Sequence, residues 1–530
     1  MTEGSIPLPV LPSAQPTQQA AGEAVAPAGG CASTKGCGSS ATGLDPEIAE
    51  KIANHPCYSQ EAHQYYARMH VPVAPGCNIQ CNYCNRKYDC SNESRPGVTS
   101  RLLSPEEALA KVKRVASEIK QMSVLGVAGP GEPLANAGRT LRTMEMVARD
   151  CPDIKLCVST NGLTLVDHVD RIEQLGIDHV TITINMTDPE IGARIYPWVL
   201  YRGKRHTGRE ASKILSDRQL AGLAALTERK ILCKVNSVMI PGVNDDHLVE
   251  VSRTVRGMGA FLHNVMPLVS APEHGTHYGL TGQRGPTPTE LQALQDRCAG
   301  DDGAEMNMMR HCRQCRADAV GLLGEDRSEE FGPETYLNGE VTYDLAGRQQ
   351  AHAAIERWRT DVRATREELR ISADGIAKPA RTVLIAVATK GGGVVNQHFG
   401  HAEEFWVYEA GENWARLVGT RSVARYCEGP SECDADESVL DKTVRLLSDC
   451  AAVLCSKIGN GPREALTAAG IDAVECYDLI DSAVAAQGAR LAAATPSQSP
   501  TGPGGSPEPG QEPVVARSMI ASRLAAEVRS

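Results

Sequence analysis

The stretch APGCNIQCNYCNRKYDC, residues 74–90, stands directly after an apolar, β-rich run of the kind that forms a buried strand. It places three cysteines at C-x3-C-x2-C spacing on the loop that follows this strand: Cys77, Cys81 and Cys84. Three thiolates ligate three irons of a [4Fe–4S] cube and leave one iron open for a substrate, whereas a closed tetrahedral zinc site takes four ligands. Cys90, six residues further on, keeps structural zinc open as an alternative.

Further β-rich runs alternate with helical patterns along the chain. Together with the first run they predict six strands, at residues 69–75, 122–129, 154–160, 178–185, 231–240 and 260–269. Helices are predicted between them, for example at 104–119, where Ser104 and Glu107 form a capping box, and at 215–230. Strands separated by helices form a parallel sheet with right-handed crossovers. We therefore expect an α/β core whose sheet is open or rolled into a partial (βα)6 barrel, with ligands at the carboxyl ends of its strands.

Composition divides the chain into five parts. Its two ends are rich in Pro, Ala, Gly and Ser and cannot bury enough apolar surface to offset ordering entropy, so we expect a disordered leader at 1–44 and a low-complexity tail at 494–530. Cys31 and Cys37, in the leader, are interpreted as passive. Between the ends lie a cysteine-rich core domain, a charged helical linker and a second domain of alternating strands and helices, at 45–326, 327–380 and 381–493.

Charge and cysteine usage bound the class of protein. The formal net charge of −11 argues against nucleic-acid binding, which draws on clustered Lys and Arg. No run reaches the ~18 apolar residues of a membrane span, and no secretory signal is evident. We expect a cytoplasmic protein, and in a reducing cytosol its 18 cysteines indicate metal ligation rather than a disulfide framework.

The cysteine loop resembles that of the radical S-adenosylmethionine (SAM) enzymes, including the aromatic Tyr83 just before the third cysteine. The segment GPGEPL (129–134), after the second predicted strand, is similar to the glycine–glutamate segment of that superfamily. The resemblance implies that the three loop cysteines are catalytic and hold a [4Fe–4S] cluster, whose open iron chelates the amino and carboxylate groups of SAM. It also implies that Gly131 and Glu132 meet the SAM amino group, because glycine lets the backbone approach a ligand closely.

Polar residues stand at the later strand ends, where the same ligand would be met. Each one alone is more typical of a strand-ending turn than of a ligand contact. Their common placement makes them candidate SAM contacts as a group: Thr160 and Asn161 in STNG (159–162), Asn185, Asn236 and the NVMPL turn (264–268).

The core domain has more cysteines than one cluster needs. Cys312 and Cys315 form a CxxC pair, which is typical of a metal site in a cytosolic protein, with a redox disulfide as the alternative. Two further cubes take about eight thiolates. The candidate ligands for them are fewer than that: Cys57, Cys90, Cys157, Cys312 and Cys315. Three others are interpreted as small buried hydrophobic residues: Cys151, Cys233 and Cys298.

Histidines can complete a ligand set that is short of thiolates. His55 and His63 flank Cys57 and are candidate ligands or proton carriers. Helix capping or hydrogen bonding in the core is the alternative for both.

As a set, these segments resemble the NifB family of nitrogenase cofactor maturases. The match covers most of residues 50–326 and rests on six segments: 55–98, 126–136, 157–162, 181–199, 235–245 and 310–326. The resemblance implies that SAM donates a methyl group and, through a second SAM, a 5′-deoxyadenosyl radical that removes hydrogen from it. Two [4Fe–4S] substrate clusters are thereby fused around a carbide, with an added sulfide, into the eight-iron core precursor of the nitrogenase cofactor.

The same resemblance implies ligand roles and partners. Cys90 is then a ligand of a substrate cluster next to the SAM cluster, and Cys57, Cys157, Cys312 and Cys315 take the other ligand roles. The implied partners are iron–sulfur cluster donors and the carrier or scaffold proteins that receive the nitrogenase cofactor precursor.

The segment IAVATKGGGVVNQHFGHAEEFWVYE, residues 385–409, is similar to the NifX-like domain, a small ribonuclease H-like α/β domain that binds nitrogenase cofactor precursors. His398 and His401, at H-x2-H spacing, are candidate contacts for the product cluster, helped by Cys427 or Cys433, and a solvated loop is the alternative. We expect this domain to store or deliver the product rather than to perform the chemistry.

Two functions of other kinds remain open. One is a non-catalytic iron–sulfur scaffold that binds and transfers preformed clusters, which would not consume SAM. The other is a single-cluster radical SAM enzyme that acts on an organic substrate, which the surplus of cysteines disfavours.

Overall fold

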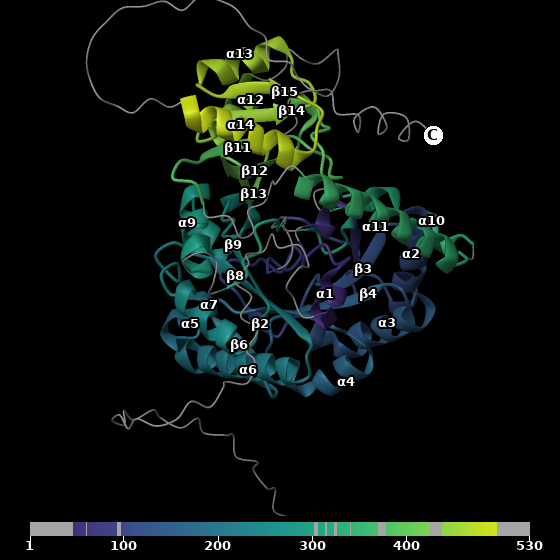
Figure 1. The fold of residues 1–530 in the computed structure, drawn as a ribbon. Coiled ribbons are helices and arrows are strands. Elements are labelled where there is room, and N and C mark those ends of the chain that lie inside the picture. The colour runs from purple at the N-terminus through teal and green to yellow at the C-terminus, as the bar shows by residue number, and fades with distance from the viewer. Residues whose placement is uncertain are drawn as a thin grey trace, which may run out of the picture.

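The computed structural model describes residues 46–59, 61–92, 97–300, 306–312, 315–322, 326–339, 341–368, 378–423 and 437–494. The expected leader, the tail from residue 495 on, and Cys31, Cys37, Cys427 and Cys433 lie outside these ranges. The described chain forms a larger body, coloured purple to teal in Figure 1, and a smaller one, coloured green to yellow.

The larger body is built on a seven-stranded sheet of order β10-β1-β3-β4-β5-β8-β9. Its parallel strands are β1 (Ala67–His70), β3 (Met122–Val127), β4 (Lys155–Thr160), β5 (His179–Thr183), β8 (Leu232–Met239) and β9 (Leu262–Pro267). They confirm the six predicted strands, in chain order across the sheet. The added edge strand β10 (Val320–Gly321) runs antiparallel to β1 and was not predicted, because two residues carry no periodic signal.

Helices cover one face of this sheet. They are α2 (Pro105–Glu118), α3 (Ala137–Asp150), α4 (Val169–Gln174), α6 (Gly208–Glu228) and α7 (Leu248–Gly257). The main apolar core lies between them and the sheet and draws on every second strand residue, for example Leu156 and Val158 of β4 and Val180 of β5. The predicted capping box is present at the start of α2, where the Ser104 side chain accepts from the Glu107 N–H at 3.1 Å.

The opposite, inner face of the sheet carries buried polar side chains instead. Lys234 and Asn236 of β8 alternate with Cys233 and Val235, which face the apolar core. Parallel strands are usually apolar on both faces because helices cover both. A polar and buried inner face therefore marks the interior of the curled sheet as the place where ligands are held.

A three-stranded sheet forms beside the cysteine loop. It joins β2 (Ile79–Gln80), which lies inside that loop, to the hairpin of β6 (Trp198–Tyr201) and β7 (Lys204–Thr207). The hairpin follows α5 (Pro189–Ile195) and leads into α6. None of these short strands was predicted.

The expected helical linker contains α11 (Leu345–Glu368), which leads to the smaller body. There the sheet order is β13-β12-β11-β14-β15, formed by β11 (Val383–Val387), β12 (Glu404–Gly411), β13 (Trp414–Ser422), β14 (Ala452–Cys455) and β15 (Asp472–Glu475). Its helices are α12 (Glu437–Leu446), α13 (Asn460–Ala468) and α14 (Ile480–Ala494). Antiparallel pairing of β11 with β12 and parallel pairing with β14 confirm the expected α/β class of this domain.

The two bodies touch at the segment that precedes β1. The Gly392 N–H donates to the Gln64 carbonyl oxygen at 3.0 Å, and the Trp406 ring lies 4.7 Å from the His63 ring, centroid to centroid. The smaller body thus lies against the larger one, above it in the view of Figure 1.

In the described part of the chain, every helix is either too short or too polar to cross a lipid bilayer.

Candidate functional site

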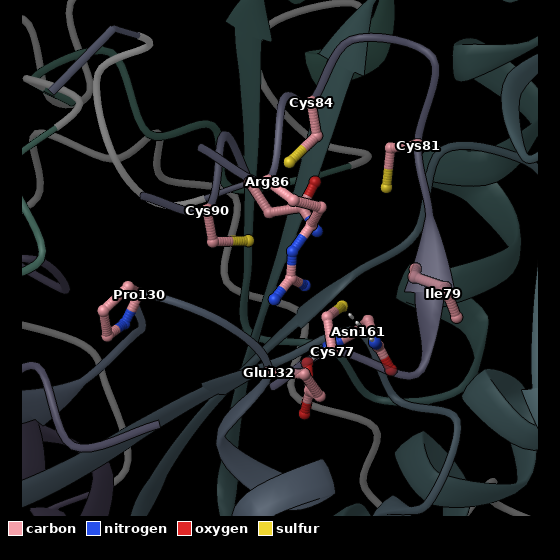
Figure 2. Close-up of a pocket in the computed structure, with 10 residues that line it drawn as sticks. Cys77, Ile79, Cys81, Cys84, Arg86, Cys90, Pro130, Glu132 and Asn161 are labelled. Carbon is pink, nitrogen blue, oxygen red and sulfur yellow. Dashed lines mark hydrogen bonds between the residues drawn. The ribbon is translucent and has the colours of Figure 1, made fainter. Parts of the chain in front are cut away.

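Four cysteines line one pocket at the carboxyl ends of the first strands. The pocket is formed by Cys77, Ile79, Cys81, Cys84, Arg86, Cys90, Asn92, Pro130, Glu132 and Asn161. Figure 2 shows the sulfur atoms of the four cysteines turned toward a common space. Within the described ranges no three His, Cys, Asp or Glu side chains lie close enough together to hold a single metal ion.

Burial controls the chemistry of these thiols. It raises the pKa of Cys81, of Cys84 and of Cys90 above the ordinary thiol value, because a thiolate is poorly solvated there. The neighbouring Cys84 thiol raises the pKa of Cys81 and Cys90 further. The thiols are therefore protonated on their own, and binding a metal cluster releases their protons.

The floor of the pocket is a contact between two backbone segments. The Gly131 N–H donates to the Ala74 carbonyl oxygen at 2.5 Å, and the Glu132 N–H donates to that of Gly76 at 2.7 Å. A Cβ atom on Gly131 would lie 2.1 Å from the Gly76 oxygen. Glycine is needed at position 131 because the loop after β3 presses against the cysteine loop.

Glu132 is a positioning residue in this structure. Its side chain is 3% exposed and accepts hydrogen bonds from the Thr160 hydroxyl at 2.5 Å and from the N–H groups of Asn161 at 2.7 Å and Leu134 at 3.0 Å. The carboxylate thus ties the loop after β3 to the end of β4. The Asn161 side chain in turn donates to Asn78 Oδ1 at 2.7 Å, next to Cys77.

Asn185 holds the cysteine loop from the end of β5. It is fully buried, its amide donates to the hydroxyls of Tyr83 at 2.7 Å and Tyr196 at 2.8 Å, and its oxygen accepts from the Val238 N–H at 2.7 Å. The Tyr83 hydroxyl donates to Asn92 Oδ1 at 2.6 Å. Tyr83 and Asn185 therefore shape the wall of the pocket, and Asn92 lines it.

A hydrogen-bond chain leads from this pocket along the inner face of the sheet. The Asn236 amide donates to the Asn92 carbonyl oxygen at 3.3 Å, and the Asn264 amide donates to Asn236 Oδ1 at 3.0 Å. Asn264 also donates to Cys312 Sγ at 3.2 Å. Asn236 thus joins the pocket to Cys312 through buried amides.

Cys312 belongs to a second cysteine group, which comprises Cys57, Cys312 and Cys315. Burial raises the pKa of Cys57 to about 11, the charges of Lys234 and Arg68 oppose this rise, and the other two thiols add to it. These interactions place the three cysteines and both cations in one neighbourhood.

Arg68 is the fixed cation of the second cysteine group. Its Nε and Nη2 atoms donate to Cys315 Sγ at 3.3 and 3.1 Å, and its Nη1 donates to the Gly321 carbonyl oxygen at 2.6 Å. A buried cation next to thiols favours their ionised, metal-binding form. Two cations on the inner face suit an anionic occupant, such as an iron–sulfur cluster held by thiolates.

His55 lies beside the second cysteine group and is fully buried. Its Nδ1 accepts from the Cys57 N–H at 3.3 Å, and its Nε2 has no hydrogen-bond partner among the described residues. Burial holds the pKa of His55 well below its usual range, so the ring is neutral. A neutral imidazole with a buried, open nitrogen has the form of a metal ligand.

The other predicted site residues lie further out. Cys157 is buried on β4 and raises the pKa of the nearby Tyr58, after the larger effect of burial. His63 is buried between His311, at 4.8 Å between ring centroids, and Trp406. His398 and His401 lie on the smaller body with ring centroids 4.8 Å apart.

Three cysteines are confirmed as members of the apolar core: Cys151, Cys233 and Cys298.

Sequence reasoning missed several residues of the site. Arg86 lines the cysteine pocket, and Arg68 and Lys234 face the second cysteine group. A signal for Lys234 was present, since a lysine inside the apolar strand ILCKVNSVMI has to be buried with a partner. Arg68 stands in a similar position in YARMHVPV.

The curled parallel sheet with three cysteines after its first strand defines a radical SAM protein, and residues 71–255 match the model of the radical SAM superfamily. Residues 381–489 match the model described as dinitrogenase iron-molybdenum cofactor. The FeMo cofactor biosynthesis protein NifB of Frankia alni is 75% identical over 478 residues, which cover 88% of this chain and 94% of that protein. That of Azotobacter vinelandii is 57% identical over 455 residues, 84% of this chain and 89% of that protein. The chain belongs to the NifB family of FeMo cofactor biosynthesis proteins.

Among solved structures, Streptococcus suis SuiB bound to precursor peptide SuiA matches with a TM-score of 0.35 and 13% identity, over 49% of this chain and 51% of SuiB. Membership of the radical SAM superfamily implies a [4Fe–4S] cluster and SAM. The cysteine pocket fits this cluster by its donor set, because three thiols of the C-x3-C-x2-C loop face one space and soft thiolates select iron–sulfur clusters.

Proposed function

We propose that this chain is the radical SAM maturase that fuses two [4Fe–4S] substrate clusters, with a SAM-derived carbide and an added sulfide, into the eight-iron core precursor of the nitrogenase cofactor. The observation that carries the proposal is the second cysteine group. It lies on the same inner face as the cysteine pocket and is joined to it through Asn236 and Asn264. A single-cluster enzyme acting on an organic substrate has no need of a second set of thiols there.

Residues of the cysteine pocket hold the cofactor and its ligand. Cys77, Cys81 and Cys84 bind the cluster that supplies one-electron chemistry to SAM. Arg86 offers a guanidinium to the SAM carboxylate, for which its paired N–H groups are suited. Gly131, Glu132, Thr160, Asn161 and the Tyr83–Asn185 pair keep the walls of the pocket in place. In this proposal few residues contact SAM directly, and most of those named keep the pocket in shape.

The substrate clusters occupy the space from Cys90 to the second cysteine group. Cys90 shares the pocket with the SAM-cluster cysteines, so a substrate cluster held there receives carbon over a short path. Cys57, Cys157, Cys312 and Cys315, with His55, ligate the substrate clusters further along. His63 is the less direct candidate, because its ring is packed between two other rings. Arg68 and Lys234 balance the negative charge of the clusters.

The smaller domain, at 381–493, holds or delivers the product. His398 and His401 are its candidate contacts with the product cluster, and nitrogenase cofactor carriers receive the product from it. Iron–sulfur cluster donors supply the core domain at 45–326. We expect that ending the chain before about residue 378 leaves SAM cleavage intact, and loss of cleavage in a soluble truncated protein would refute this division of labour.

The deciding experiment is anaerobic. Clusters are reconstituted, SAM is added, and S-adenosylhomocysteine and 5′-deoxyadenosine are quantified together. Both products are expected, because methyl transfer and hydrogen abstraction are coupled. 5′-Deoxyadenosine alone, from protein that carries all its clusters, would indicate a generic radical enzyme, and no SAM consumption would indicate a scaffold.

Variants separate the two cysteine groups in the same assay. Cys312→Ala should lower S-adenosylhomocysteine formation about ten-fold or more, because loss of a ligand weakens cluster binding. Uncoupled SAM cleavage by the intact cysteine pocket should persist within about two-fold. Cys298→Ala, in the apolar core, is the matched control and should leave both products unchanged. Equal loss of both products in Cys312→Ala would contradict separate roles for the groups.

A further inference from the structure

The β6–β7 hairpin displays a concentrated positive charge on a chain of net charge −11. Its tip and second strand read YRGKRHT (201–207), and Arg202, Lys204 and Arg205 are exposed. Arg202 and Gly203 form the tight turn, with φ of 50° and 73°. In the described part of the chain none of these three cations makes an ion pair with an acidic group, so their charge is available to a partner.

Stacking fixes two of the three cations in place. The Arg205 guanidinium lies 4.8 Å from the centroid of the Trp198 ring, and that of Arg202 lies 5.3 Å from the Tyr201 ring. Such cation–π contacts restrict the side chain while leaving its charge at the surface. Leu200 is 45% exposed on the same hairpin and adds an apolar contact. Preorganised cations around an apolar residue form a surface suited to docking an acidic protein.

The hairpin is bonded directly to the loop that carries the cysteines. Val199 pairs with Ile79, which lies between Cys77 and Cys81, and the Leu200 N–H donates to the Asn78 carbonyl oxygen at 2.7 Å. The turn begins three residues beyond Val199, which is about 10 Å along a strand. A protein seated on the hairpin therefore sits against the back of the cysteine pocket.

The reaction supplies the reason for such a partner. Homolysis of SAM to methionine and the 5′-deoxyadenosyl radical consumes one electron, and the S–C5′ bond breaks as that electron arrives. We propose that the β6–β7 hairpin is the docking surface for a small acidic one-electron carrier protein, which is oxidised by one electron for each SAM cleaved. This inference rests on the proposed function. Electron-transfer partners bury small surfaces and dissociate readily, which fits a single charged hairpin.

Charged residues on β7 also have a plainer explanation. β7 is the last strand of its sheet, and Lys or Arg on an edge strand discourages pairing between copies of a protein. Charge reversal separates the two roles, because glutamate protects an edge as well as lysine does but repels an acidic carrier.

The test compares the full chain, reconstituted with its clusters, with the variant R202E/K204E/R205E. Flavodoxin is the probe, since it is acidic and its hydroquinone gives up one electron to become the semiquinone. Binding of oxidised flavodoxin is measured by calorimetry, and 5′-deoxyadenosine formation is measured with flavodoxin hydroquinone or with dithionite as the reductant. The variant should bind flavodoxin about ten-fold or more weakly, and its flavodoxin-driven rate should fall in parallel, because opposed charges slow association. With dithionite its rate should equal that of the unaltered chain.

The matched control carries the same change in charge elsewhere. Arg357, Lys442 and Arg445 are exposed on α11 and α12, and R357E/K442E/R445E should bind flavodoxin like the unaltered chain. Equal binding to both variants would overturn the proposal. So would an unchanged flavodoxin-driven rate in the hairpin variant. Failure of the proposed function appears differently, as absence of S-adenosylhomocysteine with dithionite in the unaltered chain.

Discussion

Gly131 illustrates what one residue contributes to the site. The resemblance of the GPGEPL segment predicts a glycine whose backbone lies close to SAM. What approaches it in this structure is the chain's own backbone at Ala74 and Gly76. A glycine in a motif indicates that another group approaches the backbone closely, but the sequence does not identify that group. Whether SAM also contacts Gly131 stays a prediction.

Gly131→Ala should destabilise the cluster-free protein by about 3 kcal/mol or more, because the new Cβ meets a rigid backbone oxygen and the two loops must separate. Urea unfolding of the cluster-free chain measures this. Gly138→Ala is the control, since no heavy atom lies within 4 Å of its added Cβ on helix α3 and alanine favours a helix by about 0.5–1 kcal/mol. Equal stability of the two variants would contradict the close packing of the loops.

The cysteines of the C-x3-C-x2-C loop were more visible in the sequence than the residues around them. Cys77, Cys81 and Cys84 follow a spacing typical of cluster ligation and line one pocket, and their role as ligands stays a prediction. Arg68 and Asn264 could not be placed, because their partners, Cys315 and Cys312, lie far along the chain. Such pairings arise from tertiary packing, which local pattern does not encode.

At the scale of elements, helix α11 does more than connect the two bodies. Its sequence predicts a charged helical linker, and within it Arg348 is fully buried and pairs with Asp153 at 2.9 Å. Arg348 also donates to the carbonyl oxygens of Lys120 at 3.3 Å and Met122 at 2.5 Å, between α2 and β3. The buried Arg348 guanidinium thus joins the linker to the core domain.

Arg348→Met should lower the free energy of unfolding by about 3–5 kcal/mol, because Asp153 and three carbonyl groups lose their buried partner. The change is measured by denaturant unfolding, with limited proteolysis to locate any loosening in α11. Arg357→Met, on the exposed side of the same helix, is the control and should cost less than about 0.5 kcal/mol. Similar losses in both variants would show that α11 acts through its propensity and not through Arg348.

The elements that could be predicted are those in which buried apolar residues recur at a regular spacing along the chain. Six core strands were predicted because each lies in or beside a sequence run of seven or more residues that contains β-branched side chains. β7, with the sequence KRHT, is largely exposed and has no apolar alternation. Its strand conformation comes from pairing with β6, which is a tertiary cause.

At the scale of the molecule, buried neutral histidines make the fold sensitive to acid. Burial lowers the pKa of His179 to about 3 and that of His70 and His263 to about 4, with Lys155 adding to the effect on His179 and Arg68 to that on His70. In the unfolded chain these imidazoles bind protons near pH 6.5, whereas in the folded chain they stay neutral at that pH. Stability present at pH 7 is therefore lost as the pH falls from about 6.5 toward 4.

Between pH 7.0 and pH 5.5 each of these histidines should cost about 1 kcal/mol of unfolding free energy. Urea unfolding of the cluster-free chain at the two pH values measures the sum. In His263→Asn the difference in unfolding free energy between the two pH values should be smaller by about 1 kcal/mol. In His277→Asn, at an exposed position, this difference should be unchanged. An unchanged difference in His263→Asn would show that His263 is protonated in the folded chain.

The division of the chain into two α/β bodies followed from composition and from the renewed alternation after residue 381. The contact between them did not, since Trp406 and His63 belong to patterns that are complete within their own domains. Packing of a ring from one domain against a ring from the other depends on the tertiary structure of both, which local sequence patterns do not predict.

The pairing of Ile79 with Val199 holds the middle of the cysteine loop from behind, while Asn161 and Asn185 hold it from the front. These contacts involve no cysteine side chain, so they do not depend on a bound cluster. We therefore expect that a cluster lost to oxygen is replaced by ligand exchange at the three thiols, without refolding of the loop.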